Sequence, residues 1–400
     1  MVFVLQFLLS FIVLYLSLSV VWPFVLSVVA FSKRDANKVD NFSTIENSIL
    51  VIIPAYKEDA VIVETARKAL LHNYNKGLYK VVVLADSLEA KTLIDLEELG
   101  VEVFNVMLEK STKARAINQA MSHYVKFDFD MVVVLDADNH MRYDFLNVMN
   151  QYYNLGFKAI QGRRSAKNSH TSVSVLDGIS EELNNHILCK GQYLIGGSSR
   201  LSGSGMAFDT NVFINAMAQI DVINGFDKIL ELELVKTGIR ITYAEDAIVL
   251  DEKVSQSEVF QKQRTRWLAA QYGCFVDNFR SALFQLFSKG NWSFFQKIVI
   301  FALPPKLLLP VVLFISSLLS MLFFGFGILS IWLLLLIVLF VMTYVIAIPK
   351  QYWNKHSLVH LRKIPIAVLS TLFALVRMKS ARDKFIHTPH TNNSLFETHL

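Results

Sequence analysis

The sequence predicts an α/β domain with a mostly parallel, Rossmann-like sheet, flanked by transmembrane helices. Three observations predict this fold class. Short apolar runs alternate with helix-like stretches in the first half of residues 33–297. This middle region also has the composition of a water-soluble domain, whereas residues 1–31 carry no charge and residues 307–348 are almost wholly apolar. Alternation of strands and helices is typical of a parallel sheet covered by helices on both faces.

The composition excludes several classes of protein. Of the 400 residues, 53% are hydrophobic and only 18% are charged, which excludes a disordered chain and a purely soluble one. The net charge of +5 comes without a run of basic residues, so nothing indicates nucleic-acid binding. Cys189 and Cys274 lie far apart and form no CxxC motif. A disulfide framework and a cysteine zinc site are therefore not expected, and a reducing compartment fits.

Residues 1–32 are predicted to form a membrane-spanning helix. About 20 apolar residues cross a bilayer core, and this segment is long enough. The alternative is a signal peptide, but a basic start is missing and the apolar run is too long. Positive charge collects on the cytoplasmic side of a membrane, so the segment's end is expected there, next to Lys33, Arg34 and Lys38.

The C-terminal part is predicted to add a transmembrane hairpin. Residues 307–324 and 328–348 are apolar and are joined by a glycine-containing turn, and residues 298–303 are expected along the interface. Residues 364–376 are short for a span, so an interfacial or re-entrant helix is favoured over a fourth span. Basic residues after the hairpin indicate the cytoplasm: Lys350, Lys355, Arg362 and Lys363.

These segments predict a multi-pass protein of the cell (inner) membrane with a cytoplasmic catalytic domain. The expected divisions are an N-terminal transmembrane helix, a cytosolic domain, an interfacial segment with a transmembrane hairpin, and a cytosolic or interfacial helix with a tail. They correspond to residues 1–32, 33–297, 298–348 and 349–400.

Within the middle region, strands are expected at residues 49–53, 81–84, 101–107 and 131–135. Helices are expected between them, at residues 59–71, 88–99 and 112–124. In such sheets, ligands bind beyond the carboxyl ends of the strands. The residues that follow each strand are therefore the candidates for a functional site.

Carboxylates follow three of these strands. Glu58 follows the first, Asp86 follows the second, and Asp136 and Asp138 follow the fourth. Two carboxylates in one loop suit a hard cation such as Mg²⁺ or Mn²⁺, which would bridge to a diphosphate. The alternative for an isolated D-x-D is a turn or a helix cap. The position directly after an apolar strand favours the metal site.

Two later segments add candidate residues. Asp227 begins a helical stretch, where a carboxylate is also favoured simply by the helix dipole. Short strands are expected at residues 239–243 and 247–250. On the following helix, Gln263, Arg266 and Trp267 share a face, which suits a sugar ring or a base, while Arg264 and Arg266 suit phosphate. The alternative is a solvated basic helix with one anchoring tryptophan.

Taken together, these motifs resemble the membrane-bound family 2 glycosyltransferases, which have a GT-A fold and include cellulose- and hyaluronan-synthase-like enzymes. The resemblance covers residues 49–267 and depends on the order of seven segments. They are VIIPAYKED, ADS, KARAIN, VVVLDADNH, SGSGMAF, GFDKILELELVKTGIRITYAEDAIVLDEK and QKQRTRW.

The resemblance implies a role for each matched residue. Asp136 and Asp138 would bind metal and nucleotide, and Asp227 would be the general base. Residues Ser204, Gly205 and Met206 would line the acceptor side together with Trp267. The remaining matched residues would bind the donor nucleotide: Pro54, Tyr56, Glu58, Asp86, Lys113, Gln263, Arg264, Arg266 and Trp267.

The implied reaction is a single displacement with inversion at the anomeric carbon. Asp227 would take the proton of the acceptor hydroxyl, and the metal would neutralise the departing diphosphate. The sequence departs from the family at Phe226 and Ile229, where acidic residues are usual. This apolar neighbourhood is expected either to raise the pKa of Asp227 or to indicate a different register of the motif. Glu231 and Glu233 are the alternative bases.

The predicted function is transfer of a sugar from a UDP-linked donor to a saccharide or lipid-linked acceptor, in polysaccharide or glycoconjugate synthesis. Three predicted spans make a processive channel doubtful, so a non-processive enzyme or an export partner is an alternative. A catalytically silent membrane subunit is the competing hypothesis. A transporter is excluded by the large soluble region. His387 and His390 in the tail are expected to be polar residues without a metal.

Overall fold

The structure is a computed structural model that describes residues 2–33, 45–254, 257–354 and 359–381. Within it, an eight-stranded sheet forms the centre of the middle region, in the order β3-β2-β1-β4-β7-β6-β8-β5. Arg34, Lys38, Lys355 and the tail with His387 and His390 lie outside the described residues. The strands are β1 (Ile49–Tyr56), β2 (Tyr79–Asp86), β3 (Glu102–Asn105), β4 (Met131–Val134), β5 (His140–Met141), β6 (Ala159–Ala166), β7 (Met206–Asp209) and β8 (Ile241–Asp251).

The first half of the sheet is parallel, as the sequence predicts. Strands β3, β2, β1 and β4 all run in one direction, so their carboxyl ends share an edge. Strand β7 reverses direction between β4 and β6, and β5 is antiparallel to β8. The expected strands 239–243 and 247–250 form the single strand β8. A bulge opposite Gly162 and Arg163 absorbs the extra residues and keeps β8 paired with β6.

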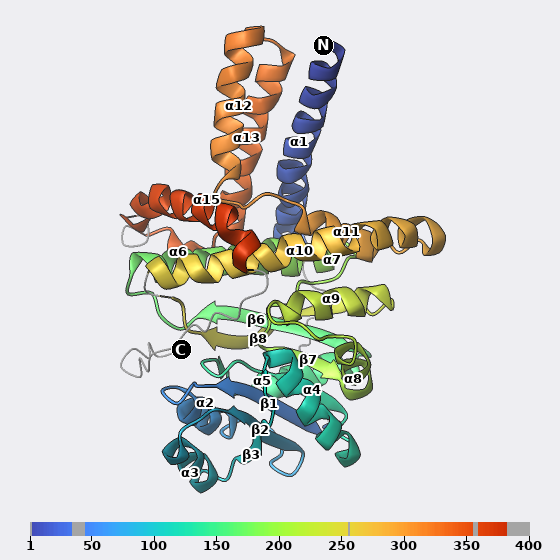
Figure 1. Ribbon diagram of the computed structural model, residues 1–400, viewed down its shortest axis with the longest axis vertical. Coiled ribbons are helices and arrows are strands. Elements are labelled where there is room, and N and C mark those ends of the chain that lie inside the picture. The colour runs from blue at the N-terminus through green and yellow to red at the C-terminus, as the bar shows by residue number, and fades with distance from the viewer. Residues whose placement is uncertain (1, 34–44, 255–256, 355–358, 382–400) are drawn as a thin grey trace.

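Helices cover both faces of the sheet, as Figure 1 shows. Successive residues of β1 point to opposite faces, so Ile49 and Val51 pack in one core and Leu50 and Ile52 in the other. Both faces are therefore apolar. The covering helices include α2 (Ile62–Ala69), α3 (Ala90–Glu98), α4 (Lys113–Tyr124), α5 (Phe145–Asn154), α8 (Thr210–Met217) and α9 (Phe226–Lys236).

A second group of helices extends away from the sheet (Figure 1). It consists of α1 (Val2–Ser32), α12 (Leu309–Phe324) and α13 (Ile328–Ala347), which share a small core that includes Leu16, Leu313 and Leu333. Among the described residues, two helices are long and apolar enough to cross a membrane, namely 9–32 and 328–347. Helix α12 has 16 residues, because it begins at Leu309, so it falls short of that length.

Helix α1 packs tightly on the sheet domain through the segment after α6 (Ser172–Leu183). This segment is the π-helix η2 (Asn184–Gly191), followed by α7 (Gln192–Leu194). A side chain on Gly191 would come within 2.6 Å of the carbonyl oxygen of Leu26, so glycine permits the close approach. Between the two groups lie α10 (Ser257–Lys289), α11 (Trp292–Phe301) and, beside α10, α15 (Ile364–Ala381) (Figure 1).

The buried His72 is expected to make the fold sensitive to mild acid. Its ring is 4% exposed, and its Nδ1 lies 3.2 Å from the carbonyl oxygen of Tyr143. Burial, with a smaller effect of Lys76, lowers the pKa of His72 to about 4, against opposing effects of the Tyr143 carbonyl and Asp144. The unfolded chain binds this proton near pH 6.5, so stability is lost as the pH falls below that value.

From pH 7 to pH 5 this residue should lower the free energy of unfolding by about 2 kcal/mol. A His72→Gln variant retains a side-chain donor for Tyr143 and should lose that part of the pH dependence. Thermal unfolding of both proteins at the two pH values measures it. Equal pH dependence in the two proteins would contradict the role of His72.

Candidate functional site

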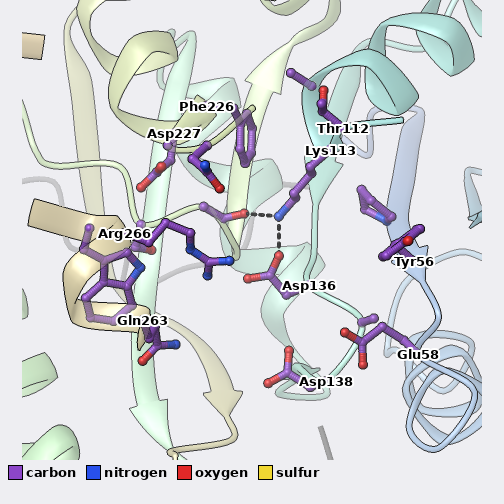
Figure 2. Close-up of a pocket in the computed structure, with 18 of the residues that line it drawn as sticks. Tyr56, Glu58, Thr112, Lys113, Asp136, Asp138, Phe226, Asp227, Gln263 and Arg266 are labelled. Atoms are coloured by element: carbon purple, nitrogen blue, oxygen red, sulfur yellow. Dashed lines mark hydrogen bonds and ion pairs between the residues drawn. The ribbon is translucent and has the colours of Figure 1, made fainter. Parts of the chain in front are cut away.

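A cavity of about 300 Å³ opens at the carboxyl ends of the parallel strands. We call it the rim cavity. Its wall comes from the loops after β1, β2 and β4, from the first turns of α4 and α9, and from α10 (Figure 2). Most of the residues that the sequence nominates line it: Pro54, Tyr56, Glu58, Asp86, Lys113, Asp136, Asp138, Asp227, Gln263, Arg266 and Trp267.

The turns after β1 and β2 shape one side of the rim cavity. Tyr56 and Asp86 are neighbours in the parallel register of the two strands. Each strand is followed by a residue in the left-handed region, Lys57 with φ 54° and Ser87 with φ 58°. Neither residue is glycine, so both positions are strained, which is common in ligand-binding loops. The amide of Lys57 donates to the carbonyl of Asp86 at 3.1 Å and holds the two turns together.

Lys113 connects three walls of the rim cavity. Thr112 caps α4 by accepting a hydrogen bond from the amide of Arg115 at 3.2 Å, so Lys113 begins the helix at the cavity edge. The Lys113 ammonium donates to Asp136 and, at 3.0 Å, to the carbonyl of Gly203 (Figure 2). It also lies 4.8 Å from the centre of the Phe226 ring, a cation–π contact. This charge is suitably placed for a phosphate group.

The D-x-D pair, Asp136 and Asp138, also lines the rim cavity and lies below Lys113 in the view of Figure 2. Asp138 is buried, and its Oδ1 accepts a hydrogen bond from Asn139 at 3.2 Å. Among the described residues there is no group of three or more His, Cys, Asp or Glu side chains that could hold a metal. Two carboxylates suffice to bind Mg²⁺ or Mn²⁺ when substrate phosphates and water supply the other ligands of the ion. The residues present therefore fit a metal that binds together with its substrate.

Asp227 faces the rim cavity from the first turn of α9 (Figure 2). The turn before it depends on Gly225, whose φ is +70° and where a side chain would meet Ala270 of α10 at 2.7 Å. The expected rise in the pKa of Asp227 is wrong. Burial does raise it, but the positive charges of Lys228, Arg200 and Lys113 outweigh burial and hold the pKa below its ordinary value. The carboxylate is therefore ionised at neutral pH.

The two alternative bases are engaged elsewhere. Glu231 forms a buried ion pair with Lys297 at 2.9 Å and accepts a hydrogen bond from the amide of Leu201 at 2.7 Å. Glu233 pairs with Lys236 at 2.6 Å. Neither side chain lines the rim cavity. Of these three carboxylates, only Asp227 lines the rim cavity.

Removing one partner of the buried Glu231–Lys297 pair should be costly. A Glu231→Gln variant leaves the Lys297 ammonium buried without its counter-charge, so the free energy of unfolding should fall by about 3–5 kcal/mol. The double variant Glu231→Leu with Lys297→Met should recover most of that loss. Thermal unfolding of the three proteins measures the effect. An equally unstable double variant would mean that packing, not charge, is responsible.

One face of helix α10 lines the rim cavity. Helical spacing places the residues of the predicted Gln-x-x-Arg-Trp motif on that face and Arg264 on another. Gln263, Arg266 and Trp267 line the cavity, as the sequence predicts. Arg264 points elsewhere: its guanidinium lies 3.6 Å from Asp177 and donates to Ser180 Oγ at 3.2 Å. The prediction that Arg264 contacts the donor therefore disagrees with the structure. A residue one step from Gln263 is turned by 100° around the helix.

The predicted acceptor residues Ser204, Gly205 and Met206 also lie outside the rim cavity. Ser204 is buried, and its Oγ accepts a hydrogen bond from the amide of Asp136 at 2.9 Å. Met206 belongs to β7 and packs in the hydrophobic core. Their neighbours Ser202 and Gly203 line the cavity instead. The segment thus supports the Asp136 loop from behind. A direct acceptor contact through these three residues is not what the structure shows.

The structure adds charged residues that the sequence did not single out. Arg164 and Lys253 both pair with Asp251, and Lys253 also reaches Glu181 at 3.3 Å. All four line the rim cavity. Burial lowers the pKa of Arg164, but Asp251, Glu181 and Asp136 outweigh it and hold the pKa above its ordinary value. No local pattern connects these residues, because the ion pairs join β6, α6 and the end of β8.

Comparison with known proteins identifies the family. Residues 47–270 match the model described as "Glycosyltransferase like family 2". No curated protein sequence matches the chain significantly. Among solved structures, the mannosyltransferase PcManGT from Pyrobaculum calidifontis, in complex with GDP-Man and Mn²⁺, is similar in fold. It is 16% identical with a TM-score of 0.53, over 84% of this chain and 98% of that one.

A second solved structure is glucosyl-3-phosphoglycerate synthase from Mycobacterium tuberculosis, in complex with Mn²⁺, UDP and glucosyl-3-phosphoglycerate. It is 16% identical with a TM-score of 0.37, over 56% of this chain and 78% of that one. At these identities the comparison concerns the fold alone.

Proposed function

The chain belongs to glycosyltransferase family 2, a family of enzymes, and we propose that it is an inverting, membrane-bound member that builds a polysaccharide or a glycoconjugate. It would move a sugar from a nucleotide-sugar to a saccharide or lipid-linked acceptor. The observation that carries this proposal is the rim cavity, where Asp227 faces Asp136, Asp138 and Lys113 (Figure 2).

The donor nucleotide would lie along the carboxyl ends of β1 and β2. Pro54, Tyr56, Glu58 and Asp86 line this side, where an aromatic ring and carboxylates suit a base and ribose hydroxyls. Lys113 and Arg266 would contact the diphosphate as fixed positive charges. The resemblance to cellulose- and hyaluronan-synthase-like enzymes implies a uridine nucleotide. PcManGT is a complex with GDP-Man, so both nucleotides belong in the test.

Asp136 and Asp138 would hold Mg²⁺ or Mn²⁺ together with diphosphate oxygens. When bound, the ion would neutralise the charge that develops on the departing nucleoside diphosphate. The structure of PcManGT contains Mn²⁺, which supports a divalent metal at this position. Gln263 and Trp267 complete the opposite wall, where the indole offers a flat apolar face to a sugar ring.

Asp227 would act as the general base. Its carboxylate takes the proton of the acceptor hydroxyl while that oxygen bonds to the anomeric carbon, and the bond to the diphosphate breaks on the opposite side. The low pKa keeps Asp227 unprotonated at neutral pH, ready to accept this proton. The buried network of Arg164, Asp251 and Lys253 would fix the wall behind the metal site.

The membrane assignment rests on the helices beyond the sheet domain. Helices α12 and α13 expose large apolar side chains, including Phe323 at 72% and Ile328 at 89%, which water would disfavour. We propose that α1, α12 and α13 cross the cell (inner) membrane and that α10 and α15 lie at its cytoplasmic surface. Lys33 and Lys350 mark that side under the positive-inside rule.

The experiment is a nucleoside diphosphate release assay with the purified full-length protein in membranes. The panel consists of UDP- and GDP-sugars, including GDP-mannose, each with Mg²⁺, Mn²⁺ or excess EDTA. Release from one donor that requires the metal is the expected result. Specific nucleotide binding without release from any donor, with acceptors supplied, would instead support a catalytically silent subunit.

A further inference from the structure

A second cavity, of about 200 Å³, lies between the sheet domain and the helices that extend from it. We call it the inter-helix cavity. Its wall comes from α1, from α6 and the π-helix η2, from the loop after α7, from α9 to α13 with the loop between α11 and α12, and from α15. These elements meet where α1 and α13 reach the sheet domain (Figure 1). The proposed function assigns no task to this cavity.

The charge of the inter-helix cavity is strongly positive. Among the described residues that line it, five are cationic and Glu231 is the only carboxylate; the cations are Arg200, Lys228, Arg264, Lys297 and Lys306. Glu231 neutralises Lys297, and Asp227 lies 3.6 Å from Lys228. Asp177 lies at the same distance from Arg264, so Arg200 and Lys306 are left to supply the excess.

Arg264 and Lys306 have partners that balance their charge only in part. The Arg264 Nε is buried and has no hydrogen-bond partner in the described part of the chain, and its nearest carboxylate, Asp177, is 3.6 Å away. Lys306 donates to the neutral amide oxygen of Asn184. Burial, together with the charges of Arg200 and Arg264, lowers the pKa of Lys306 to about 7. An anion between these residues would relieve their mutual repulsion.

The rest of the wall is apolar and faces the proposed membrane side. Val20 and Pro23 of α1, Leu309 of α12 and Phe340 of α13 line the cavity. Both α1 and α13 are long and apolar enough to span a bilayer. A ligand that suits this wall has a hydrocarbon chain beside an anionic group.

Two contacts join the inter-helix cavity to the catalytic residues. Trp267 lines both cavities. Asp227 lines the rim cavity, and the adjacent Lys228 lines the inter-helix cavity. The two cavities are therefore adjacent at Trp267 and at the start of α9.

We propose that the inter-helix cavity binds the acceptor, and that this acceptor is a saccharide joined through phosphate to a hydrocarbon chain. The phosphate lies among Arg200, Arg264 and Lys306, the hydrocarbon chain follows α1 and α13, and the saccharide stacks on Trp267. The acceptor role rests on the proposed function. Binding of the lipid phosphate does not, because it requires no donor and no catalysis.

The test measures equilibrium binding to the detergent-purified full-length protein by thermophoresis, without nucleotide. The probes are phytanyl phosphate, phytanol and inorganic phosphate. Phytanyl phosphate should bind at least about tenfold more tightly than either of the others, since only it has both the charge and the chain. Lys306→Met should weaken its binding about tenfold or more, and Lys306→Arg should largely restore it.

Lys350→Met is the matched control, because Lys350 is exposed in the short helical turn after α13 and lies outside the cavity, so this variant should bind like the wild type. Mn²⁺–UDP binding by the Lys306 variants reports a folded donor site. Equal affinities for phytanol and phytanyl phosphate would overturn the proposal, and so would inorganic phosphate that binds as tightly as the lipid. Unchanged lipid binding in Lys306→Met would overturn it as well. Failure of nucleotide release, by contrast, would leave this result untouched.

Discussion

Replacing Asp227 by Asn should lower kcat/KM for sugar transfer about a thousandfold, since a positioned general base contributes roughly 10²–10⁴ in rate. The amide has nearly the same shape but cannot take a proton. Binding of Mn²⁺–UDP should change little, because Asp227 would contact the acceptor rather than the nucleotide. Initial rates of nucleoside diphosphate release, with nucleotide affinity measured beside them, separate the two effects.

The control for Asp227→Asn is Glu98→Gln, which neutralises an exposed carboxylate on α3 far from the rim cavity. It should retain the wild-type rate. The pH profile adds a second check, because a pKa held below the ordinary value leaves Asp227 ionised throughout the mildly acidic range. Release that persists in Asp227→Asn would show that another group accepts the proton.

The second large effect is expected at the D-x-D pair. Asp138→Asn should weaken binding of Mn²⁺ in the presence of UDP about a hundredfold, because even outer-shell changes cost roughly 10–100-fold. Asp136→Asn should do the same and should also free Lys113, which pairs with Asp136. Calorimetric titration of Mn²⁺ into the UDP-bound protein measures both. Activity should be lost in parallel and should vanish in wild type with EDTA.

Unchanged Mn²⁺ affinity in both Asp136→Asn and Asp138→Asn would exclude these carboxylates as metal ligands. Asp136 and Asp138 would then only stabilise the turn after β4. Glu98→Gln again serves as the control for a general loss of negative charge. Because Asp138 is buried, its variant needs a thermal unfolding measurement beside the titration. A folded variant that binds UDP without the metal is the most informative result.

The parallel half of the sheet could be predicted from the sequence because its signals are local. Apolar β1, β2 and β4 are each followed by a carboxylate, and parallel strands bring their ends to one edge. This reasoning located Asp86, Asp136 and Asp138 in the rim cavity. Helical spacing likewise placed Gln263, Arg266 and Trp267 on one face.

The remainder depends on tertiary contacts that no local pattern records. The burial of Ser204 follows from its hydrogen bond to Asp136, a residue distant in sequence. The low pKa of Asp227 depends on Arg200 and Lys113, which the fold brings near it, and on the adjacent Lys228, whereas the prediction weighed only the apolar Phe226 and Ile229. The network of Arg164 and Asp251 could not be foreseen for the same reason.

The contact at Gly191 has a consequence for how the protein is made. Helix α1 is synthesised before the segment on which it packs, and the inter-helix cavity also needs Phe340 and Tyr344 of α13. Because domains form from the N-terminus during synthesis, the nucleotide-binding half can fold well before α13 emerges. A nascent chain would thus complete the rim cavity first, and the inter-helix cavity would stay incomplete until α13 and α15 have been synthesised.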